Sequence, residues 1–210
     1  MVVFKNYENK KAALMNKKYY KVKCVLGIII TCILLPLVLL AIVGGIIAIK
    51  LEDGGPAFYR ADRLGKNGKT FKVWKLRTMV VNAPDIRLDD GSTFNSKDDP
   101  RVTKFGKFAR KTSMDELPQV FNVLRGEMAL IGPRPDLPED WDNFHELEKR
   151  AMVIRPGITG YNQVVNRNNC TAIEKLENDI YYAENMSFKL DLWITGMSVK
   201  AVLSSNNVYR

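Results

Sequence analysis

Histidine and cysteine are scarce in this sequence of 210 residues. His145 is the single histidine, so a Ser–His or Cys–His mechanism would depend wholly on it, and it stands in a polar helical stretch typical of a protein surface. Cys24 and Cys32 lie inside an apolar run, and Cys170 stands apart, without a CxxC or Cys/His spacing. The cysteines therefore exclude a disulfide framework and a zinc site, and they favour a reducing compartment.

Acidic residues are few at one end of the chain, which gives a formal net charge of +9. Residues 1–23 hold seven lysines and one acidic residue, whereas residues 51–210 hold 24 basic and 22 acidic residues. A basic segment beside an apolar run is typical of a cytoplasmic flank near anionic lipid headgroups. This distribution argues against nucleic acid as a partner, because nucleic-acid binding needs a basic surface on the folded domain.

Charge is absent from 26 consecutive positions, residues 24–49. A helix of this length would reach about 39 Å, and the hydrocarbon core of a bilayer is about 30 Å thick. The apolar core is too long for a cleavable signal peptide, and no small-residue cleavage site follows it. We therefore expect a basic N-terminal segment, residues 1–19, a membrane segment, residues 20–50, and a membrane-associated domain, residues 51–210.

Two arrangements of the membrane segment fit its sequence. Pro36 stands at its middle, where it removes a helix hydrogen bond and clashes with the preceding turn. Basic residues flank the segment on both sides, which predicts that both ends are cytoplasmic: Lys17, Lys18, Lys21 and Lys23 before it, and Lys50, Arg60, Arg63, Lys66, Lys69 and Lys72 after it. A re-entrant helix-break-helix satisfies both observations, and a single span kinked at Pro36 satisfies the first.

The domain after the membrane segment is predicted to be α+β and mostly helical. A β-hairpin is expected over residues 58–64 and 70–79, with "GKNG" as its turn. The stretch "GKNGKT" is not a phosphate-binding loop, because Arg63 stands where that motif needs its first glycine. Helices are expected near residues 102–111, 117–128, 139–152 and 172–184. Residues 188–205 are amphipathic and are expected to lie on the membrane or on the core.

The stretch "TSMDELPQ" places two carboxylates, Asp115 and Glu116, side by side. Pro118 is tolerated only in the first turn of a helix, so a helix should begin near residues 115–117. One interpretation makes Asp115 the N-cap that accepts backbone N–H bonds. The other makes the pair reactive, because a helix N-terminus also attracts phosphate. Adjacent helical residues point about 100° apart, so the two carboxylates would have different roles.

Two arginines are held by prolines. Arg134 lies between Pro133 and Pro135, and Arg155 precedes Pro156, so each has a restricted backbone. A planar guanidinium suits phosphate or carboxylate. Each alone is explained equally well as a solvated charge on a surface loop. Lys75, Arg77 and Arg110, the cations near other motifs, are individually explained as solvated charges too. Together with two carboxylates at a membrane surface, they suit phosphoryl chemistry on a lipid-linked substrate, but they do not name the reaction.

Five motifs, taken in order and spacing over about residues 20–200, resemble those of the bacterial sugar transferases that act on polyprenol phosphate, the small monotopic phosphoglycosyl transferases. They read "FKVWKLRTM", "DDPRVTKFGKFAR", "SMDELPQVFNVLRGEMALIGPRP", "RPGITGYNQV" and "DIYYAENMSFKLDLWI". The resemblance implies transfer of a sugar 1-phosphate from a UDP-sugar to undecaprenyl phosphate, with release of UMP. Such a step begins the assembly of capsule, exopolysaccharide, O-antigen or glycoprotein glycans.

The resemblance also implies roles for the candidate residues. Asp115 matches the family's nucleophile, which forms a covalent phosphosugar intermediate and divides one transfer into two steps. Glu116 would assist it, and Mg²⁺ would neutralise the diphosphate with Asp115 as a contact. Four cations would bind nucleotide or phosphate: Arg134, Arg110, Lys75 and Arg77. Arg155 is expected to bind phosphate as well, because its backbone is constrained by Pro156. The expected location is the bacterial cytoplasmic membrane, with a re-entrant segment and the domain on the cytoplasmic face.

Two departures from the family pattern limit what the resemblance implies. Many relatives have serine before the break proline, where this chain has Leu35, so the geometry of the break stays open. Asn162 and Asn166 depart from the family's usual residues, so the identity of the sugar is not carried over. Two other classes of function remain as alternatives: a membrane-anchored interaction module whose acidic pair only caps a helix, and a phosphohydrolase that cleaves nucleotide-sugars with water.

Overall fold

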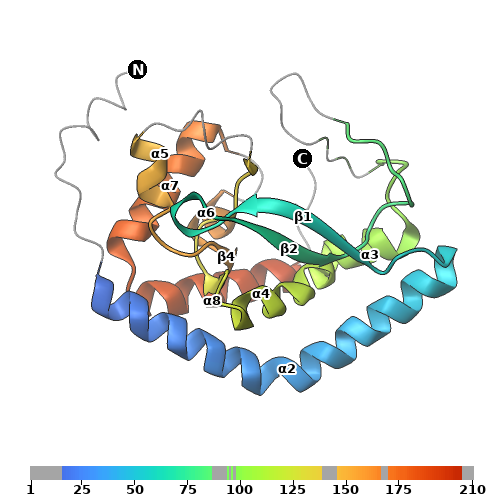
Figure 1. Ribbon diagram of the computed structural model, residues 1–210, viewed down its shortest axis with the longest axis horizontal. Helices are drawn as coiled ribbons and strands as arrows, with labels where there is room; N and C mark the ends of the chain where they lie inside the picture. The colour runs from blue at the N-terminus through green and yellow to red at the C-terminus, as the bar shows by residue number, and fades with distance from the viewer. Residues whose placement is uncertain are drawn as a thin grey trace.

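The computed structural model describes residues 16–86, 94, 96, 98–138, 146–166 and 170–204. His145, most of the predicted N-terminal segment and the first half of the helix predicted over residues 139–152 lie outside these ranges. In Figure 1 one long helix, α2, runs along an edge of the molecule, and the other elements lie on its concave side.

Helix α2, Lys17–Asp53, contains the whole predicted membrane segment. It begins where the Asn16 side chain accepts a hydrogen bond from the Tyr19 backbone N–H, and it ends at Gly54, which adopts the left-handed conformation with φ of 69°. Large apolar side chains remain exposed along it, among them Ile33, Leu37 and Leu40. By length and composition, it is the one helix in the described ranges that could cross a membrane.

The predicted break at Pro36 is a bend inside a continuous helix. Pro36 lies within α2, which is helical on both sides of it, and the ribbon bends near its middle (Figure 1). A proline removes one backbone donor and displaces one carbonyl, which kinks a long helix without requiring irregular residues. The prediction of two helices separated by a break is therefore wrong in its local geometry. That both ends of α2 lie on one side of a membrane stays a prediction.

The predicted hairpin is confirmed. Strands β1, Phe58–Leu64, and β2, Thr70–Leu76, pair antiparallel, and the turn contains the short 3₁₀ helix η1, Lys66–Gly68. Asn67 and Gly68 supply the positive φ values of 55° and 74° that this turn needs. Strand β2 ends three residues before the predicted Met79. A second sheet, absent from the predictions, pairs β3, Ala129–Ile131, with β4, Gly157–Thr159, in parallel.

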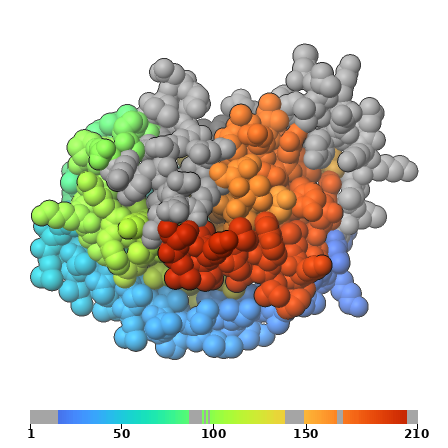
Figure 2. Space-filling view, turned by 180° about the vertical axis from the view of Figure 1, so that it is seen from behind, coloured from blue at the N-terminus to red at the C-terminus, as the bar shows by residue number. Residues whose placement is uncertain are grey.

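The other regular elements of the described chain are helices, as the α+β, mostly helical prediction requires. The predicted helices near residues 102–111 and 172–184 are confirmed as α3, Lys104–Thr112, and α7, Ala172–Asn185. The remaining ones are η2, Met114–Gln119, a 3₁₀ helix, and the α-helices α4, Val120–Leu124, α5, Glu146–Ala151, α6, Tyr161–Val165, and α8, Phe188–Ser204. From behind, α8 lies alongside α2 (Figure 2).

Apolar clusters join both halves of α2 to the rest of the fold. Near its N-terminal end, Tyr20 is buried with Ile154, Tyr182 and Ile194. Near its C-terminal end, Ile42 and Ile49 are buried with Ala57 and Leu76 of the hairpin region. A third cluster packs the hairpin on α4 and β3 through Phe71, Val73, Val123 and Met128. The long apolar helix is therefore packed against the domain and does not project away from it.

Candidate active site

The acidic pair lies on a tight turn between α3 and α4. Ser113 ends α3 in the left-handed conformation, with φ of 57°, and the 3₁₀ helix η2 follows at once. Asp115 is therefore inside the first turn, after the N-cap position that Ser113 occupies, and the prediction that Asp115 is the N-cap is wrong. Pro118 fits, as predicted, near the helix start. This turn faces strand β2 and the loop after β3, because Glu116 contacts Lys75 and Arg134 there.

Glu116 is held by two cations from different parts of the chain. Its Oε1 accepts a hydrogen bond of 2.7 Å from Lys75 Nζ on β2, and it lies 3.4 Å from both terminal nitrogens of Arg134. Burial alone would raise the pKa of Glu116, but the charges of Lys75 and Arg134 and their hydrogen bonds outweigh it and lower the pKa to about 2. Glu116 is thus ionised at any physiological pH.

Asp115 has the opposite character. Its side chain is buried, with 9% of the residue's surface exposed. Burial raises the pKa of Asp115 to about 6, and the negative charge of Glu116 adds to this; the charges of Lys75, Arg110 and Arg134 partly oppose the increase. Two adjacent carboxyl groups whose pKa values are pushed apart are typical of a site with divided roles. Asp115 is the member that gains and loses its proton close to neutral pH.

Arg110 approaches the pair from the last turn of α3. Its Nε donates a 3.0 Å hydrogen bond to the Thr78 hydroxyl, and its charge lowers the pKa of Asp115. Helix α3 packs closely on Thr78 because Gly106 has no side chain; a Cβ there would lie 2.0 Å from the Thr78 carbonyl oxygen. The structure therefore brings together five predicted residues around one point: Asp115, Glu116, Lys75, Arg110 and Arg134.

The loop that carries Arg134 is fixed from behind. Strands β3 and β4 approach so closely that a Cβ on Gly157 would lie 2.0 Å from the Gly132 nitrogen. The Gly132 N–H donates to Thr159 O, and the Gly157 N–H donates to Pro133 O. The glycines of "IGPRP" and "RPGITG" are thus needed where the two motifs cross. Arg134 itself is about half exposed, with 52% of its side-chain surface accessible.

Arg77 and Arg155 are not brought to this cluster by any contact within the described residues. Arg77 is buried, and its guanidinium donates to the Asp53 carboxylate, to Pro56 O and to Met79 O. It connects the end of α2 to the hairpin. The Arg155 guanidinium lies over Gly126, and its backbone N–H donates to the Tyr20 hydroxyl. That these two arginines bind substrate stays a prediction without a supporting contact.

Asn122 is a buried polar residue beside the site that the sequence reasoning missed. It is fully buried; its side-chain oxygen accepts from the Trp74 N–H at 3.1 Å, and its amide donates to Lys72 O at 2.8 Å and to Glu127. It therefore fastens α4 to the part of β2 that carries Lys75. The available signal was a lone amide inside the apolar run "VFNVL", because buried polar groups need hydrogen-bond partners.

The site offers a divalent cation few protein ligands. Among the described residues, no group of three or more His, Cys, Asp or Glu side chains could hold a metal ion. Glu116 is occupied by two cations, which leaves Asp115 as the acidic ligand. Mg²⁺ is commonly bound through one or two carboxylates plus substrate phosphates. One carboxylate, Asp115, is compatible with Mg²⁺ that arrives with a diphosphate, and its contact with Mg²⁺ stays a prediction.

The fold is a mostly helical domain packed on one long apolar helix, and its site is a carboxylate pair among cations. A comparison with known protein families assigns the chain to a class. The family model described as bacterial sugar transferase matches residues 18–205, so the chain belongs to that family. The resemblance drawn from the five motifs is confirmed.

Curated relatives carry related names. The chain is 41% identical over 172 residues to the galactosyl transferase CpsE of Streptococcus agalactiae, covering 76% of this chain and 38% of the relative. It is 37% identical over 169 residues to the undecaprenyl-phosphate galactose phosphotransferase of Salmonella typhimurium, covering 75% and 36%. It is 36% identical over 205 residues to the UDP-N-acetylgalactosamine-undecaprenyl-phosphate N-acetylgalactosaminephosphotransferase of Aeromonas hydrophila, covering 94% and 48%. The chain thus spans less than half the length of these relatives.

Proposed function

We propose that this chain is a phosphoglycosyl transferase that moves a sugar 1-phosphate from a UDP-sugar to undecaprenyl phosphate. The observation that carries the proposal is the buried Asp115, whose pKa is raised to about 6 beside Lys75, Arg110 and Arg134. Buried carboxylates that titrate near neutral pH are typical of reactive sites. The two relatives whose names specify an undecaprenyl-phosphate sugar phosphotransferase support the choice of donor and acceptor.

The proposed chemistry gives Asp115 and Glu116 different roles. Ionised Asp115 attacks the phosphorus that bears the sugar, the bond from that phosphorus to the oxygen of UMP breaks, and UMP leaves. A phosphate oxygen of undecaprenyl phosphate then attacks the same phosphorus, and the bond to Asp115 breaks to release the enzyme. Lys75, Arg110 and Arg134 supply positive charge where phosphate oxygens gather. Bound Mg²⁺ would neutralise part of the donor's diphosphate charge.

Glu116 is the positioning member of the pair in this proposal. Its carboxylate contacts Lys75 and Arg134 together, and these residues come from β2 and from the loop after β3. Without that negative charge, two cations would repel each other across the site. Glu116 therefore keeps both at the distance at which a phosphate could lie between them and Asp115.

The proposed setting is the cytoplasmic face of a bacterial membrane. The apolar side chains exposed on α2 and on α8, such as Leu37, Leu40, Leu192 and Leu203, would lie against lipid. A bent α2 that enters and leaves by the same face would keep its basic flanks in the cytoplasm. The soluble donor and the lipid acceptor could then reach Asp115 in turn.

Lipid-dependent release of UMP is the expected result of the direct test. The full chain, purified in detergent, is incubated with Mg²⁺ and a panel of UDP-sugars, with and without undecaprenyl phosphate. We expect repeated turnover with at least one donor only when the lipid is present. Equal UMP turnover without the lipid would identify a phosphohydrolase. No turnover with any donor would favour a membrane-anchored interaction module and contradict the proposal.

Protection of both ends of α2 is the expected result of a topology test. Lys17 and Lys69 are exposed in the fold, so each is replaced singly by cysteine in a chain that lacks Cys24, Cys32 and Cys170. Intact cells are treated with a thiol reagent that does not cross the membrane, and lysed cells serve as the labelling control. We expect neither position to react in intact cells. Labelling of one position alone would establish a single span.

A further inference from the structure

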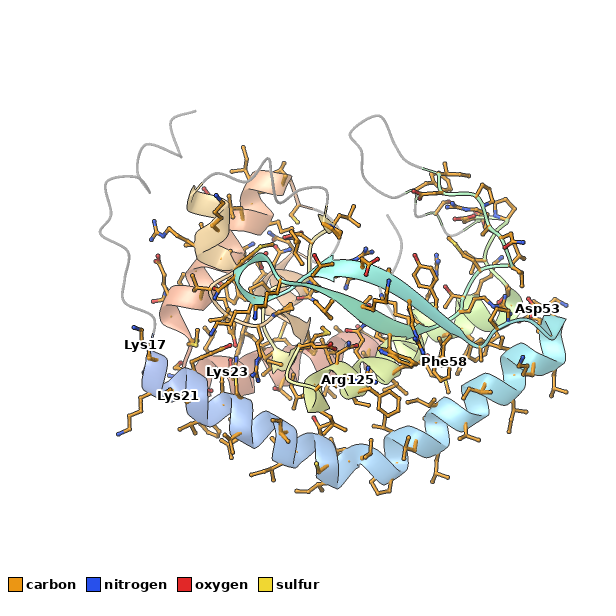
Figure 3. All side chains as sticks on the ribbon, viewed as in Figure 1. Lys17, Lys21, Lys23, Asp53, Phe58 and Arg125 are labelled. Carbon is orange, nitrogen blue, oxygen red and sulfur yellow. The ribbon has the colours of Figure 1, made fainter. Side chains whose placement is uncertain are left out.

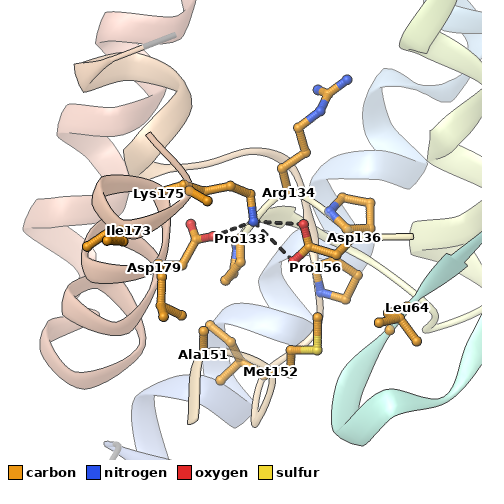
Figure 4. A pocket seen from close by; sticks show the side chains of 15 residues that line it. Leu64, Pro133, Arg134, Asp136, Ala151, Met152, Pro156, Ile173, Lys175 and Asp179 are labelled. Atoms are coloured by element: carbon orange, nitrogen blue, oxygen red, sulfur yellow. Dashed lines mark hydrogen bonds and ion pairs between the residues drawn. The ribbon is translucent and has the colours of Figure 1, made fainter. Parts of the chain in front are cut away.

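A pocket lies behind the loop that carries Arg134 (Figure 4). Its volume is about 320 Å³. One wall is the loop Pro133–Asp136, a second wall is α7, and Met152, Ile154 and Pro156 contribute apolar surface. Ligand pockets are mostly apolar, with a few placed polar groups, and begin at about this volume. The pocket therefore has the size and lining of a site for one small ring.

The polar group of this pocket is a lysine between two aspartates. Lys175 Nζ lies 2.8 Å from Asp136 Oδ1 and 3.1 Å from Asp179 Oδ2. Asp179 is buried, whereas Lys175 and Asp136 keep 28% and 26% of their side-chain surfaces exposed. Burial raises the pKa of Asp179 to about 6, although the charge of Lys175 opposes it, so Asp179 is mainly ionised at neutral pH. Two negative charges against one positive charge disfavour phosphate in the pocket.

Arg134 separates this pocket from the acidic pair. Its backbone lines the pocket, while its side chain points away from Lys175 (Figure 4) and reaches Glu116 at 3.4 Å. The pocket wall is fixed in place, since the Leu64 N–H of the hairpin donates a 2.9 Å hydrogen bond to Asp136 O. The pocket and the acidic pair thus share the loop Pro133–Asp136, so one molecule that contacts Arg134 with its phosphates could reach the pocket with a neutral part.

We propose that this pocket receives the sugar ring of the donor and that Asp136 and Lys175 determine which sugar is accepted. The inference rests on the proposed function. Carboxylates accept hydrogen bonds from hydroxyl groups, and the lysine can donate to them. Among the described residues, those that line the pocket include no aromatic side chain on which a uracil base would stack. The apolar wall from Met152 and Ile154 suits the C–H face of a sugar or the methyl of an N-acetyl group.

Asp136→Asn tests the assignment. This change preserves shape but converts an acceptor-only group into one that also donates. We expect it to change the ratio of kcat/KM between two UDP-sugars that differ at one hydroxyl by about tenfold or more, because a polar group covered by the bound sugar is left mispaired. The inhibition constant of UMP should stay unchanged. Asp62→Asn is the matched control, since Asp62 forms an exposed pair with Lys72, 2.9 Å away on the hairpin.

A second variant narrows the pocket without altering its charges. Ala172 is exposed at the start of α7 and lines the pocket, so Ala172→Phe should obstruct it from the surface. We expect weaker binding of UDP-sugars, but not of UMP, measured by calorimetry without lipid. Equal weakening for UMP would place the nucleoside in the pocket and overturn the proposal. Unchanged preference among the UDP-sugars in both variants would also overturn it.

The binding measurement separates this inference from the proposed function. Wild-type protein that binds UDP-sugars selectively, but transfers no sugar phosphate to lipid, would contradict the proposed function and leave the pocket assignment standing. Wild-type protein that transfers sugar phosphate but binds every UDP-sugar only as tightly as UMP would support the proposed function and contradict the pocket assignment.

Discussion

Asp115→Asn is expected to abolish UMP release and, at neutral pH, to make the folded protein more stable. The amide keeps the shape of the side chain but cannot act as the nucleophile. It also removes a charge that the fold holds in a buried place, where the pKa is raised from 3.8 to about 6. Each pKa unit corresponds to about 1.4 kcal/mol, so the expected gain in the free energy of unfolding is about 1–3 kcal/mol.

The pH dependence of this gain follows from the direction of the shift. Well below pH 3.8, Asp115 is protonated in both the folded and the unfolded chain, and the variant should approach the wild type in stability. Between about pH 4 and pH 6 the unfolded chain loses its proton first, so the wild type becomes progressively less stable. Above about pH 6 the difference should be constant. Thermal unfolding in detergent at pH 4 and pH 7.5, together with the UMP assay, measures both effects.

Glu116→Gln provides the matched comparison, because the adjacent carboxylate has a lowered pKa. Its folded pKa of about 2 lies below the ordinary value of 4.5, so its charge stabilises the fold above about pH 4.5, and this stabilisation is lost on acidification. This variant should therefore be less stable than the wild type at pH 7.5. Full activity of Asp115→Asn would disprove the assignment of Asp115 as the nucleophile. A loss of stability in Asp115→Asn at pH 7.5 would disprove the described electrostatics.

Local patterns predicted the elements that depend on neighbouring residues. The hairpin followed from strand alternation around "GKNG", and α3 and α7 followed from helical stretches with clear ends. The cluster of Asp115, Glu116, Lys75, Arg110 and Arg134 was expected from short motifs with constrained backbones, and the structure does place these residues together. Proline and glycine made the prediction possible, because they limit the backbone whatever the distant chain does.

Features that depend on distant residues were not predictable from such patterns. Strands β3 and β4 contain three residues each and pair across more than twenty residues of sequence, too short a pattern to detect. Arg77 was expected inside the second strand of the hairpin, residues 70–79, but β2 ends at Leu76. Arg77 instead pairs with Asp53 at the end of α2, and nothing in the local sequence indicates that partner.

Lys23 is the clearest case of a residue whose role could not be predicted from the local sequence. Its sequence position places it among the basic residues that flank the membrane segment, as if it faced lipid headgroups. Figure 3 shows Lys17 and Lys21 pointing outward, whereas Lys23 points into the domain. It is 9% exposed, and its Nζ lies 3.1 Å from Asp191 on α8 and donates to Ile131 O at 2.9 Å. Contacts more than one hundred residues away in the chain determine its role.

Lys23→Met is therefore expected to destabilise the protein by about 3–5 kcal/mol, the usual cost of leaving a buried charge without its partner. Asp191 would keep hydrogen bonds of 2.8 Å from the Tyr19 hydroxyl and 2.6 Å from the Tyr182 hydroxyl, but no neutralising charge. Lys21→Met, the same change at an exposed position two residues away, should alter stability by less than about 0.5 kcal/mol. Unfolding in detergent, monitored by circular dichroism, measures both variants.

The double variant Lys23→Met/Asp191→Asn decides whether the ion pair itself accounts for the loss. If the cost comes from an unpaired carboxylate, the double variant should be more stable than the sum of the two single changes predicts, by about 1 kcal/mol or more. Additive losses would show that packing of the lysine side chain accounts for the effect. Lys23 also donates to the carbonyl of Ile131, three residues before Arg134. A folded Lys23→Met protein should consequently bind the donor less tightly, because the strand before the loop of Arg134 loses one hydrogen bond to α2.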